Sequence, residues 1–83
     1  MKNSKVEKYR IEDLKNSISD LQTIYTAILT IAENKNKIAI ETLINSALNC
    51  SADIDRQITE CGGVGFTSID STLDFIYDLE NNK

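Results

Sequence analysis

Residues 11–32, with the sequence IEDLKNSISDLQTIYTAILTIA, decide the fold of this chain. Apolar residues recur here at alternating intervals of three and four, which is the pattern of a heptad stripe along one face of a helix. Polar and charged residues occupy most of the other positions, as on a helix with one solvated side. The members of the stripe are Ile11, Leu14, Ile18, Leu21, Tyr25, Ile28 and Ala32. We therefore predict a first helix over about residues 5–33.

The stripe of this helix widens toward its C-terminal end, where Ile24, Leu29 and Ile31 join it. A helix with a narrow seam at one end and a broad apolar face at the other is expected to contact more neighbours at the broad end. At 1.5 Å per residue the helix would be roughly 43 Å long, which is longer than one small globule requires. The length predicts an antiparallel helical hairpin, a dimer, or both.

A second helix is predicted over about residues 37–61, after the polar stretch ENKNK. Asn34 or Asn36 is expected to cap its first turn, because an asparagine side chain accepts a hydrogen bond from a free backbone N–H. Good helix formers are scarce at residues 49–53, so a break there is the alternative to one long helix. The stripe of this second helix consists of Ile40, Ile44, Ala47, Ser51, Ile54, Ile58 and Cys61, widened by Leu43 and Leu48.

Glycines mark the end of the second helix. Gly62 and Gly63 are expected to stop it, because glycine readily takes the left-handed conformation that follows a helix. A third, shorter helix is predicted over about residues 68–80, with Thr67 and Asp70 in the spacing of a capping box. Its expected apolar face consists of Ile69, Leu73, Ile76 and Tyr77, widened by Phe75 and Leu79.

The three helices predict an all-α chain that forms a single domain over residues 1–83. A chain of this length buries little surface, and one short helix cannot cover two long stripes. We therefore expect a homodimer in which two hairpins form a helical bundle, with a complex with another protein as the alternative. The residues expected at the dimer or partner interface are Ile11, Leu14, Ile18, Leu21, Tyr25, Ile28, Ile40, Ile44, Ile54 and Ile58.

Charge is distributed unevenly along the chain, which has a net charge of −4. Residues 1–10 form a basic N-terminal arm with four cations and one acid, while the other 73 residues contain five cations and twelve acids. Such an arm can contact nucleic-acid phosphates, although a pI of about 4.6 is unlike that of most nucleic-acid-binding domains. The candidate nucleic-acid contacts are Lys2, Lys5, Lys8 and Arg10.

An acidic row is expected on the third helix, where Asp70, Asp74 and Asp78 follow one another at intervals of four. Residues at this spacing lie on one helix face. The row is a candidate face for a basic partner, or a mimic of nucleic-acid phosphates. It is equally what the solvated side of an amphipathic helix looks like.

Catalysis, cofactors and metals are not expected. The chain has no histidine, which removes Ser-His-Asp and Cys-His catalysts and histidine-containing zinc sites. Cys50 and Cys61 cannot make a four-thiolate site, and on an unbroken helix they lie about 16 Å apart, too far for a disulfide. The segment 62–66 with its three glycines resembles an anion-binding loop only loosely, because no lysine and no strand accompany it. We interpret the cysteines as structural and the loop as a turn.

The predicted function is that of a small acidic helical protein that binds and inhibits or otherwise modulates another protein without catalysis. Alternatives are a nucleic-acid-associated regulator acting through the basic arm, and an adaptor or chaperone. A chain rich in Ile, Lys and Asn indicates an AT-rich gene, as in a low-GC bacterium, a phage or a plasmid. For a phage or plasmid gene, an anti-defence factor (anti-CRISPR or anti-restriction) is one form of this function. No apolar stretch has the length of a membrane span, and the charged N-terminus is not a signal peptide, so we expect a cytoplasmic protein without a membrane partner.

Overall fold

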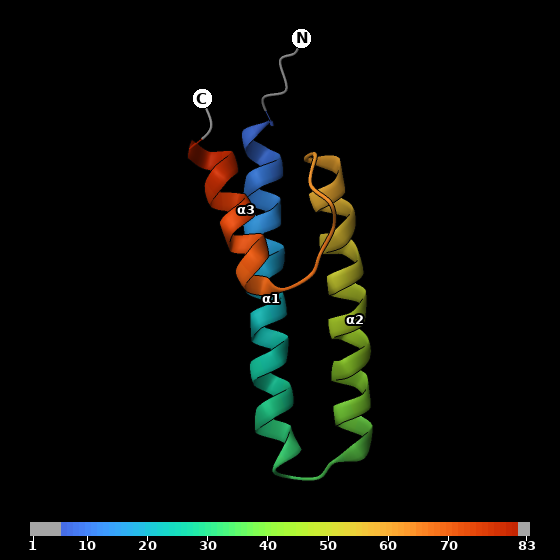
Figure 1. Cartoon of the computed structure of the whole chain (residues 1–83). Helices are drawn as coiled ribbons and strands as arrows, with labels where there is room; N and C mark the ends of the chain where they lie inside the picture. Colours follow the sequence, from blue (N-terminus) through green and yellow to red (C-terminus); the bar gives the residue numbers. More distant parts are fainter. Residues whose placement is uncertain (1–5, 82–83) are drawn as a thin grey trace.

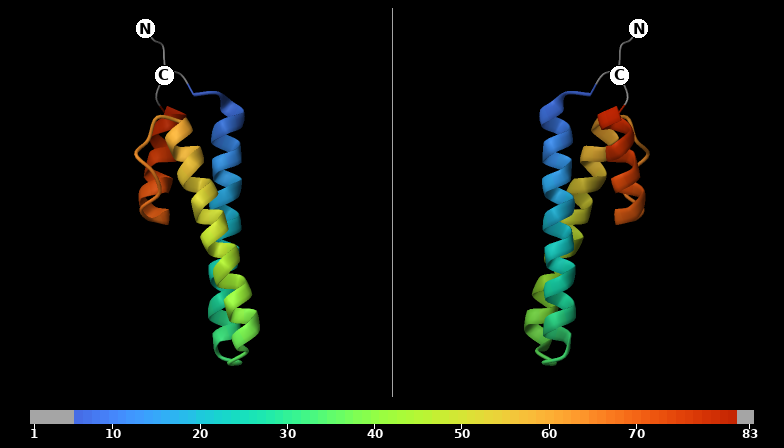
Figure 2. Two further views of the ribbon diagram at one scale, coloured as in Figure 1. Left: turned by 90° about the vertical axis from the view of Figure 1, so that its right-hand side faces the viewer. Right: turned by 90° about the vertical axis from the view of Figure 1, so that its left-hand side faces the viewer.

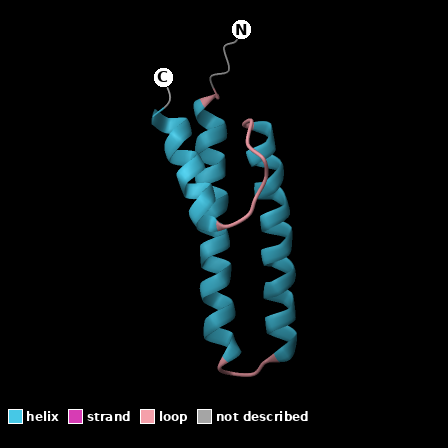
Figure 3. Ribbon diagram, viewed as in Figure 1, coloured by secondary structure: helices cyan, strands magenta, loops and turns pink. Residues whose placement is uncertain are grey.

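The structure is a computed structural model that describes residues 6–81, and over these residues it contains three α-helices and no strand. Helix α1 spans Lys8–Ala32, α2 spans Lys37–Glu60 and α3 spans Ile69–Asn81. Figures 1 and 3 show α1 and α2 as an antiparallel hairpin, with α3 beside the first half of α1. The predicted all-helical fold, a long antiparallel hairpin followed by a short C-terminal helix, is confirmed for the described residues.

Helix α2 runs without a break through residues 49–53, so the alternative of two shorter helices is excluded. Its first turn is capped by Asn36, whose side-chain oxygen accepts a 3.1 Å hydrogen bond from the backbone N–H of Ala39. Asn36 is one of the two caps that the sequence predicts. The cap fixes the point at which the chain leaves the turn between α1 and α2.

The C-terminal end of α2 is closed by glycine, as predicted. The backbone N–H of Gly62 donates to Thr59 at 3.0 Å, and that of Gly63 donates to Ile58 at 2.9 Å. This pair of bonds requires a left-handed residue directly after the cap, and Gly62 has a φ of +93°. The closure turns the chain back toward the hairpin.

The cap of α3 differs from the prediction, because it is Ser68 rather than Thr67. Ser68 Oγ accepts a 3.1 Å hydrogen bond from the backbone N–H of Ser71, whereas Thr67 Oγ1 lies 2.7 Å from Ser71 Oγ. The helix begins at Ile69, so Ser68 occupies the position from which a side chain reaches the N–H three residues on. The predicted pairing of Thr67 with Asp70 is therefore wrong.

The hydrophobic core lies where all three helices meet. Leu14, Leu21 and Ile54 are completely buried, and the other core members are at most 9% exposed. An ion pair of 2.9 Å between Lys15 and Glu80 joins α1 to α3 at the edge of this core. The remaining buried apolar residues are Ile11, Ile18, Ala47, Ile58, Cys61 and Ile76.

Helix α3 buries a face that differs from the predicted one. Thr72 is buried, while Leu73 and Tyr77 are 43% and 65% exposed. The hydroxyl of Thr72 donates to the backbone carbonyl of Ser68 at 2.8 Å, which satisfies its polar group inside the helix. Its methyl group can then face the core at no cost in unpaired hydrogen bonds. The predicted face is therefore wrong for Leu73 and Tyr77.

Helix α3 covers only one half of the hairpin. It has 13 residues, or about 20 Å, against 25 residues and about 37 Å for α1. Figure 2 shows α3 and the preceding loop on one side of the hairpin, beside the half that contains the start of α1. We call this the proximal half, and we call the half made by residues 22–48, with the turn, the distal half. Within the described chain the broad C-terminal end of α1 packs only against α2, so the additional neighbours predicted for it are not supplied by α3.

Candidate interaction surfaces

The distal half of the hairpin carries an exposed apolar surface, which we call the distal apolar face. It is formed by Tyr25 and Leu29 of α1 and by Ile44 and Leu48 of α2, which are 41%, 72%, 43% and 61% exposed. On each helix the two residues are four apart, so their side chains lie one above the other. Large apolar side chains gathered in this way are typical of a contact surface.

The distal apolar face lies on the side of the hairpin that α3 occupies. Tyr25 lines a hollow of about 390 Å³ together with Phe66, Ser68 and Ile69, where α3 begins. On α2, Asp55 lies two turns beyond Leu48 on the same side, and its carboxylate accepts a 2.7 Å hydrogen bond from the backbone N–H of Phe66. The face is therefore the uncovered continuation of the surface on which α3 packs.

The structure divides the predicted interface residues between the core and the surface. Tyr25 and Ile44 are exposed and belong to the distal apolar face, while Ile28 and Ile40 are half-buried beside it. Leu29 and Leu48, which the sequence showed only as widening the stripes, complete the face. The remaining six are buried within the chain: Ile11, Leu14, Ile18, Leu21, Ile54 and Ile58. These six pack inside one chain and do not lie on a free surface.

The acidic row of α3 is exposed, as an amphipathic helix would place it. None of Asp70, Asp74 and Asp78 forms an ion pair with another described residue. Leu73 and Tyr77, which the sequence assigned to the apolar face, lie beside this row on the outside of the helix. We call these five residues the outer face of α3. It combines negative charge with exposed apolar surface, whereas the sequence predicts Leu73 and Tyr77 on the buried side.

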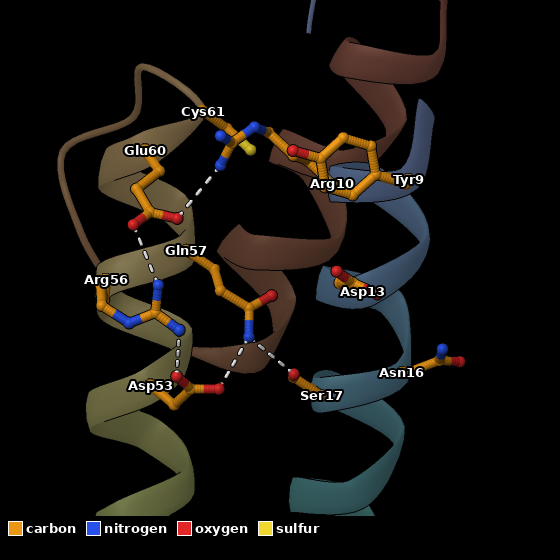
Figure 4. Close-up of a pocket in the computed structure, with 10 residues that line it drawn as sticks. All are labelled: Tyr9, Arg10, Asp13, Asn16, Ser17, Asp53, Arg56, Gln57, Glu60 and Cys61. Carbon is orange, nitrogen blue, oxygen red and sulfur yellow. Dashed lines mark hydrogen bonds and ion pairs between the residues drawn. The ribbon is translucent and has the colours of Figure 1, made fainter. Parts of the chain in front are cut away.

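A polar cleft of about 470 Å³ lies between the proximal parts of α1 and α2. Figure 4 shows Arg10 and Ser17 of α1 facing Glu60 and Gln57 of α2, with α3 behind them and Asn16 turned away from α2. Arg10 of α1 pairs with Glu60 of α2 at 3.2 Å, and Glu60 also pairs with Arg56 at 2.9 Å. Gln57 crosses the cleft and donates a 2.9 Å hydrogen bond to Ser17 Oγ. The cleft is therefore spanned by contacts that join the two helices.

Four of the five charged residues that line this cleft pair with one another, and Asp13 has no ion-pair partner among the described residues. Arg56 pairs with Asp53 as well as Glu60, and it holds the pKa of the Asp53 carboxyl below its usual value, with a further hydrogen bond from Gln57. Both arginines, Arg10 and Arg56, thus have carboxylate partners within the chain. We interpret the cleft as a set of contacts that hold α1 and α2 together rather than as a ligand site.

The basic arm is only partly covered by the structure. Lys2 and Lys5 lie outside the described residues. Lys8 is exposed at the start of α1. Arg10 is half-buried and pairs with Glu60 at 3.2 Å and with Glu7 at 3.8 Å. Of the candidate nucleic-acid contacts, Arg10 is therefore already engaged within the chain.

Both cysteines are free and packed, in agreement with a structural interpretation. Cys50 is half-buried, and its Sγ donates a 3.5 Å hydrogen bond to the backbone carbonyl of Ser17. Burial raises the pKa of the Cys50 thiol, and the neighbouring Asp20 and Asp53 act in the same direction. Burial also raises the pKa of the Cys61 thiol. Neither thiol is activated as a nucleophile would be.

We expect both thiols to react slowly with iodoacetamide in the folded protein. A raised pKa lowers the thiolate fraction at pH 7.5, and packing restricts access, so labelling should be about tenfold or more slower than in the unfolded chain. Mass spectrometry of samples quenched at intervals measures the rate, with the protein in urea as the control. Equal rates in the two samples would contradict the packing of Cys50 and Cys61.

The glycine loop binds a carboxylate of its own chain. The backbone N–H of Phe66 donates to Asp55 Oδ1, and the same oxygen lies 2.6 Å from where a Cβ on Gly65 would be. A donor that an anion site would need is thus occupied, and the nearby carboxylate would repel an anion. These contacts support the interpretation as a turn.

Among the described residues, no three Cys, Asp or Glu side chains are placed to hold a metal ion. None of the three helices is both long enough and apolar enough to cross a membrane.

The chain was also compared with known proteins. It matches no protein-family model, no curated protein and no solved structure.

Proposed function

We propose that the protein is a non-catalytic interaction module that works as a homodimer and binds another protein to modulate it. The observation that carries this proposal is the distal apolar face, whose four side chains are 41–72% exposed at an end of the hairpin that no other helix of the described chain covers. Small monomeric proteins rarely leave large apolar side chains clustered in this way. A second copy is the simplest cover, because it presents the same face.

The free energy gained by burying the distal apolar face in a dimer is moderate. Complete burial of an exposed leucine or isoleucine contributes about 1.5–3 kcal/mol. Because the four side chains are already part-buried, covering them on both copies contributes roughly 8 kcal/mol. Association costs about 4–15 kcal/mol, so the apolar face alone roughly balances this cost. We therefore propose a dimer that dissociates on dilution and that needs further contacts at its margin.

The second surface of the proposal is the outer face of α3, which we assign to the target protein. Tyr77 is 65% exposed and Leu73 is 43% exposed, beside three carboxylates that lack ion-pair partners among the described residues. Exposed tyrosines are frequent anchors at protein interfaces, and charges around them steer association. This combination suits a basic partner surface with an apolar pocket at its centre. Inhibition by occupying such a surface is the mechanism that we propose.

An inhibitor of a nucleic-acid-binding enzyme is one form of this function. The carboxylates of Asp70, Asp74 and Asp78 follow one another at intervals of about 6 Å along the helix. A row of negative charges can occupy a groove that otherwise receives phosphates. A phage- or plasmid-encoded anti-defence factor, such as an anti-CRISPR or anti-restriction protein, would act in this way.

The test of target binding compares variants of the outer face. Immobilised wild-type protein would be used to capture proteins from a bacterial lysate, beside Tyr77→Ala and Asp74→Lys. We expect a captured protein whose affinity falls about tenfold or more in both variants, because a buried tyrosine anchor contributes about 2 kcal/mol or more. Tyr9→Ala removes another exposed tyrosine, off this face, and should leave capture unchanged. Capture that is insensitive to both outer-face variants would contradict the assignment.

A nucleic-acid role through the basic arm has less support. Arg10 pairs with carboxylates of its own chain, and the described body carries the exposed acidic row. Retardation of DNA in low salt that is lost when Lys8 is replaced by glutamine would favour this alternative.

A further inference from the structure

We propose that two copies associate through the distal apolar face in an antiparallel arrangement, in which the turn of each hairpin reaches the start of α3 in the other. This inference rests on the proposed homodimer and adds its orientation and register. The occupant of the distal apolar face is thus a second copy of this chain. Leu29 is then expected to lie beside the two-fold axis.

The orientation follows from the position of α3. Helix α3 lies on the side of the hairpin that carries the distal apolar face, as a second layer over the proximal half (Figure 2). Packed helix layers are about 8–10 Å apart. If two copies met with their turns at the same end, both α3 helices would stand between them and would hold the distal faces apart. In the antiparallel arrangement, each distal half occupies the layer of the partner's α3, directly beyond the first turn of that helix.

The register follows from the length of the distal half. Tyr25 shares a hollow with Ile69 and therefore lies level with the beginning of α3. From Tyr25 to the end of α1 at Ala32 there are seven residues, or about 10 Å. A partner hairpin that slides along this surface stops when its turn meets the start of α3. The midpoint of the overlap lies close to Leu29, which is 72% exposed.

Charges at the two ends of the overlap are complementary. The turn carries Lys35 and Lys37 with one acid, Glu33, all of them exposed, and the start of α3 carries the exposed Asp70. The antiparallel arrangement brings the lysines of one copy to Asp70 of the other. A two-fold axis repeats this contact, so each pairing occurs twice. These ion pairs are the further contacts, at the margin of the distal apolar face, that the dimer needs.

Crosslinking tests the register. Leu29→Cys is expected to form a disulfide-linked dimer under mild oxidation, because a residue beside a two-fold axis meets its own copy. Thr30→Cys is the matched control, since the next residue points about 100° around the helix, and Thr30 is also exposed. Wild-type protein under the same conditions measures the contribution of Cys50 and Cys61. We expect at least tenfold more linked dimer from Leu29→Cys than from either control.

Charge reversal tests the orientation. We expect Lys37→Glu to raise the dissociation constant of the dimer about 3–10-fold at low salt, because each dimer contains the pairing twice. Asp70→Lys should do the same, and the double variant should recover most of the wild-type affinity. Sedimentation equilibrium over a wide range of protein concentration measures each constant.

The outcomes separate this inference from the proposed function. A wild-type dimer whose Leu29→Cys variant does not crosslink, and whose charge variants do not compensate, overturns the antiparallel register while the homodimer stands. Wild-type protein that remains monomeric at all concentrations overturns the dimer and this inference together, and leaves target binding by α3 to be judged by its own variants.

Discussion

Replacement of Ile54 by alanine is expected to lower the free energy of unfolding by about 3–4 kcal/mol. Ile54 of α2 is completely buried in the core, to which all three helices contribute residues. The substitution removes three carbon atoms and leaves a cavity that the surrounding helices fill only in part. A chain of this size has a total stability of roughly 4–12 kcal/mol, so the loss is a large fraction of it. Urea denaturation followed by circular dichroism measures the change.

Ile38→Ala is the matched control for this prediction. It makes the same chemical change on the same helix, but Ile38 is 77% exposed near the turn. Its effect on the free energy of unfolding is expected to stay within about 0.5 kcal/mol. Equal losses in the two variants would mean that the core does not lie where the three helices meet.

Replacement of Gly65 by alanine is expected to lower the free energy of unfolding by about 2–4 kcal/mol and to loosen α3. Gly65 has a φ of +115°, which is strained for a residue with a side chain. A Cβ there would lie 2.6 Å from Asp55 Oδ1, the oxygen that holds the N–H of Phe66. The new methyl group therefore displaces the carboxylate that fixes the loop. Relative to the wild-type protein, the amide hydrogen-exchange rate should increase more in α3 than in the distal half of the hairpin.

Gly62→Ala separates strain from the clash. Gly62 also has a positive φ, of +93°, but no atom lies within 4 Å of the position of its Cβ. We expect this variant to cost about 1 kcal/mol, from backbone strain alone. If it cost as much as Gly65→Ala, the contact between Asp55 and the loop would not anchor α3.

The helices and their order could be predicted because the signals for them are local. The seven-residue stripe from Ile11 to Ala32 is a periodicity of one helix, and the Gly62–Gly63 pair is a stop signal of one helix end. The buried face of α3 could not be predicted with the same certainty. In the sequence Thr72 is a polar residue. In the folded chain its hydroxyl donates a hydrogen bond to the carbonyl of Ser68, and this bond makes burial of its other atoms favourable. Because Thr72 is buried in place of Leu73 and Tyr77, these two side chains form the exposed apolar part of the outer face.

The candidate surfaces could be predicted only where they depend on a local pattern. The acidic row is a repeat of four along one helix, so its place on one face follows from the sequence. The stripes of α1 and α2 are continuous in sequence, and nothing in them distinguishes residues packed within the chain from residues left for a partner. That distinction depends on where α3 lies.

The sequence by itself thus determined three helices, their lengths, the stops between them and the acidic face, because each depends on residues within a few turns of one another. Tertiary structure alone decided that α3 packs on the proximal half, that Arg10 pairs with Glu60, and that Tyr25, Leu29, Ile44 and Leu48 stay exposed. The loop from Gly62 to Ser68 returns the chain only to the level of Tyr25 before α3 begins. A helix of 13 residues that starts there and runs back toward the N-terminal end of α1 leaves the distal half of the hairpin open.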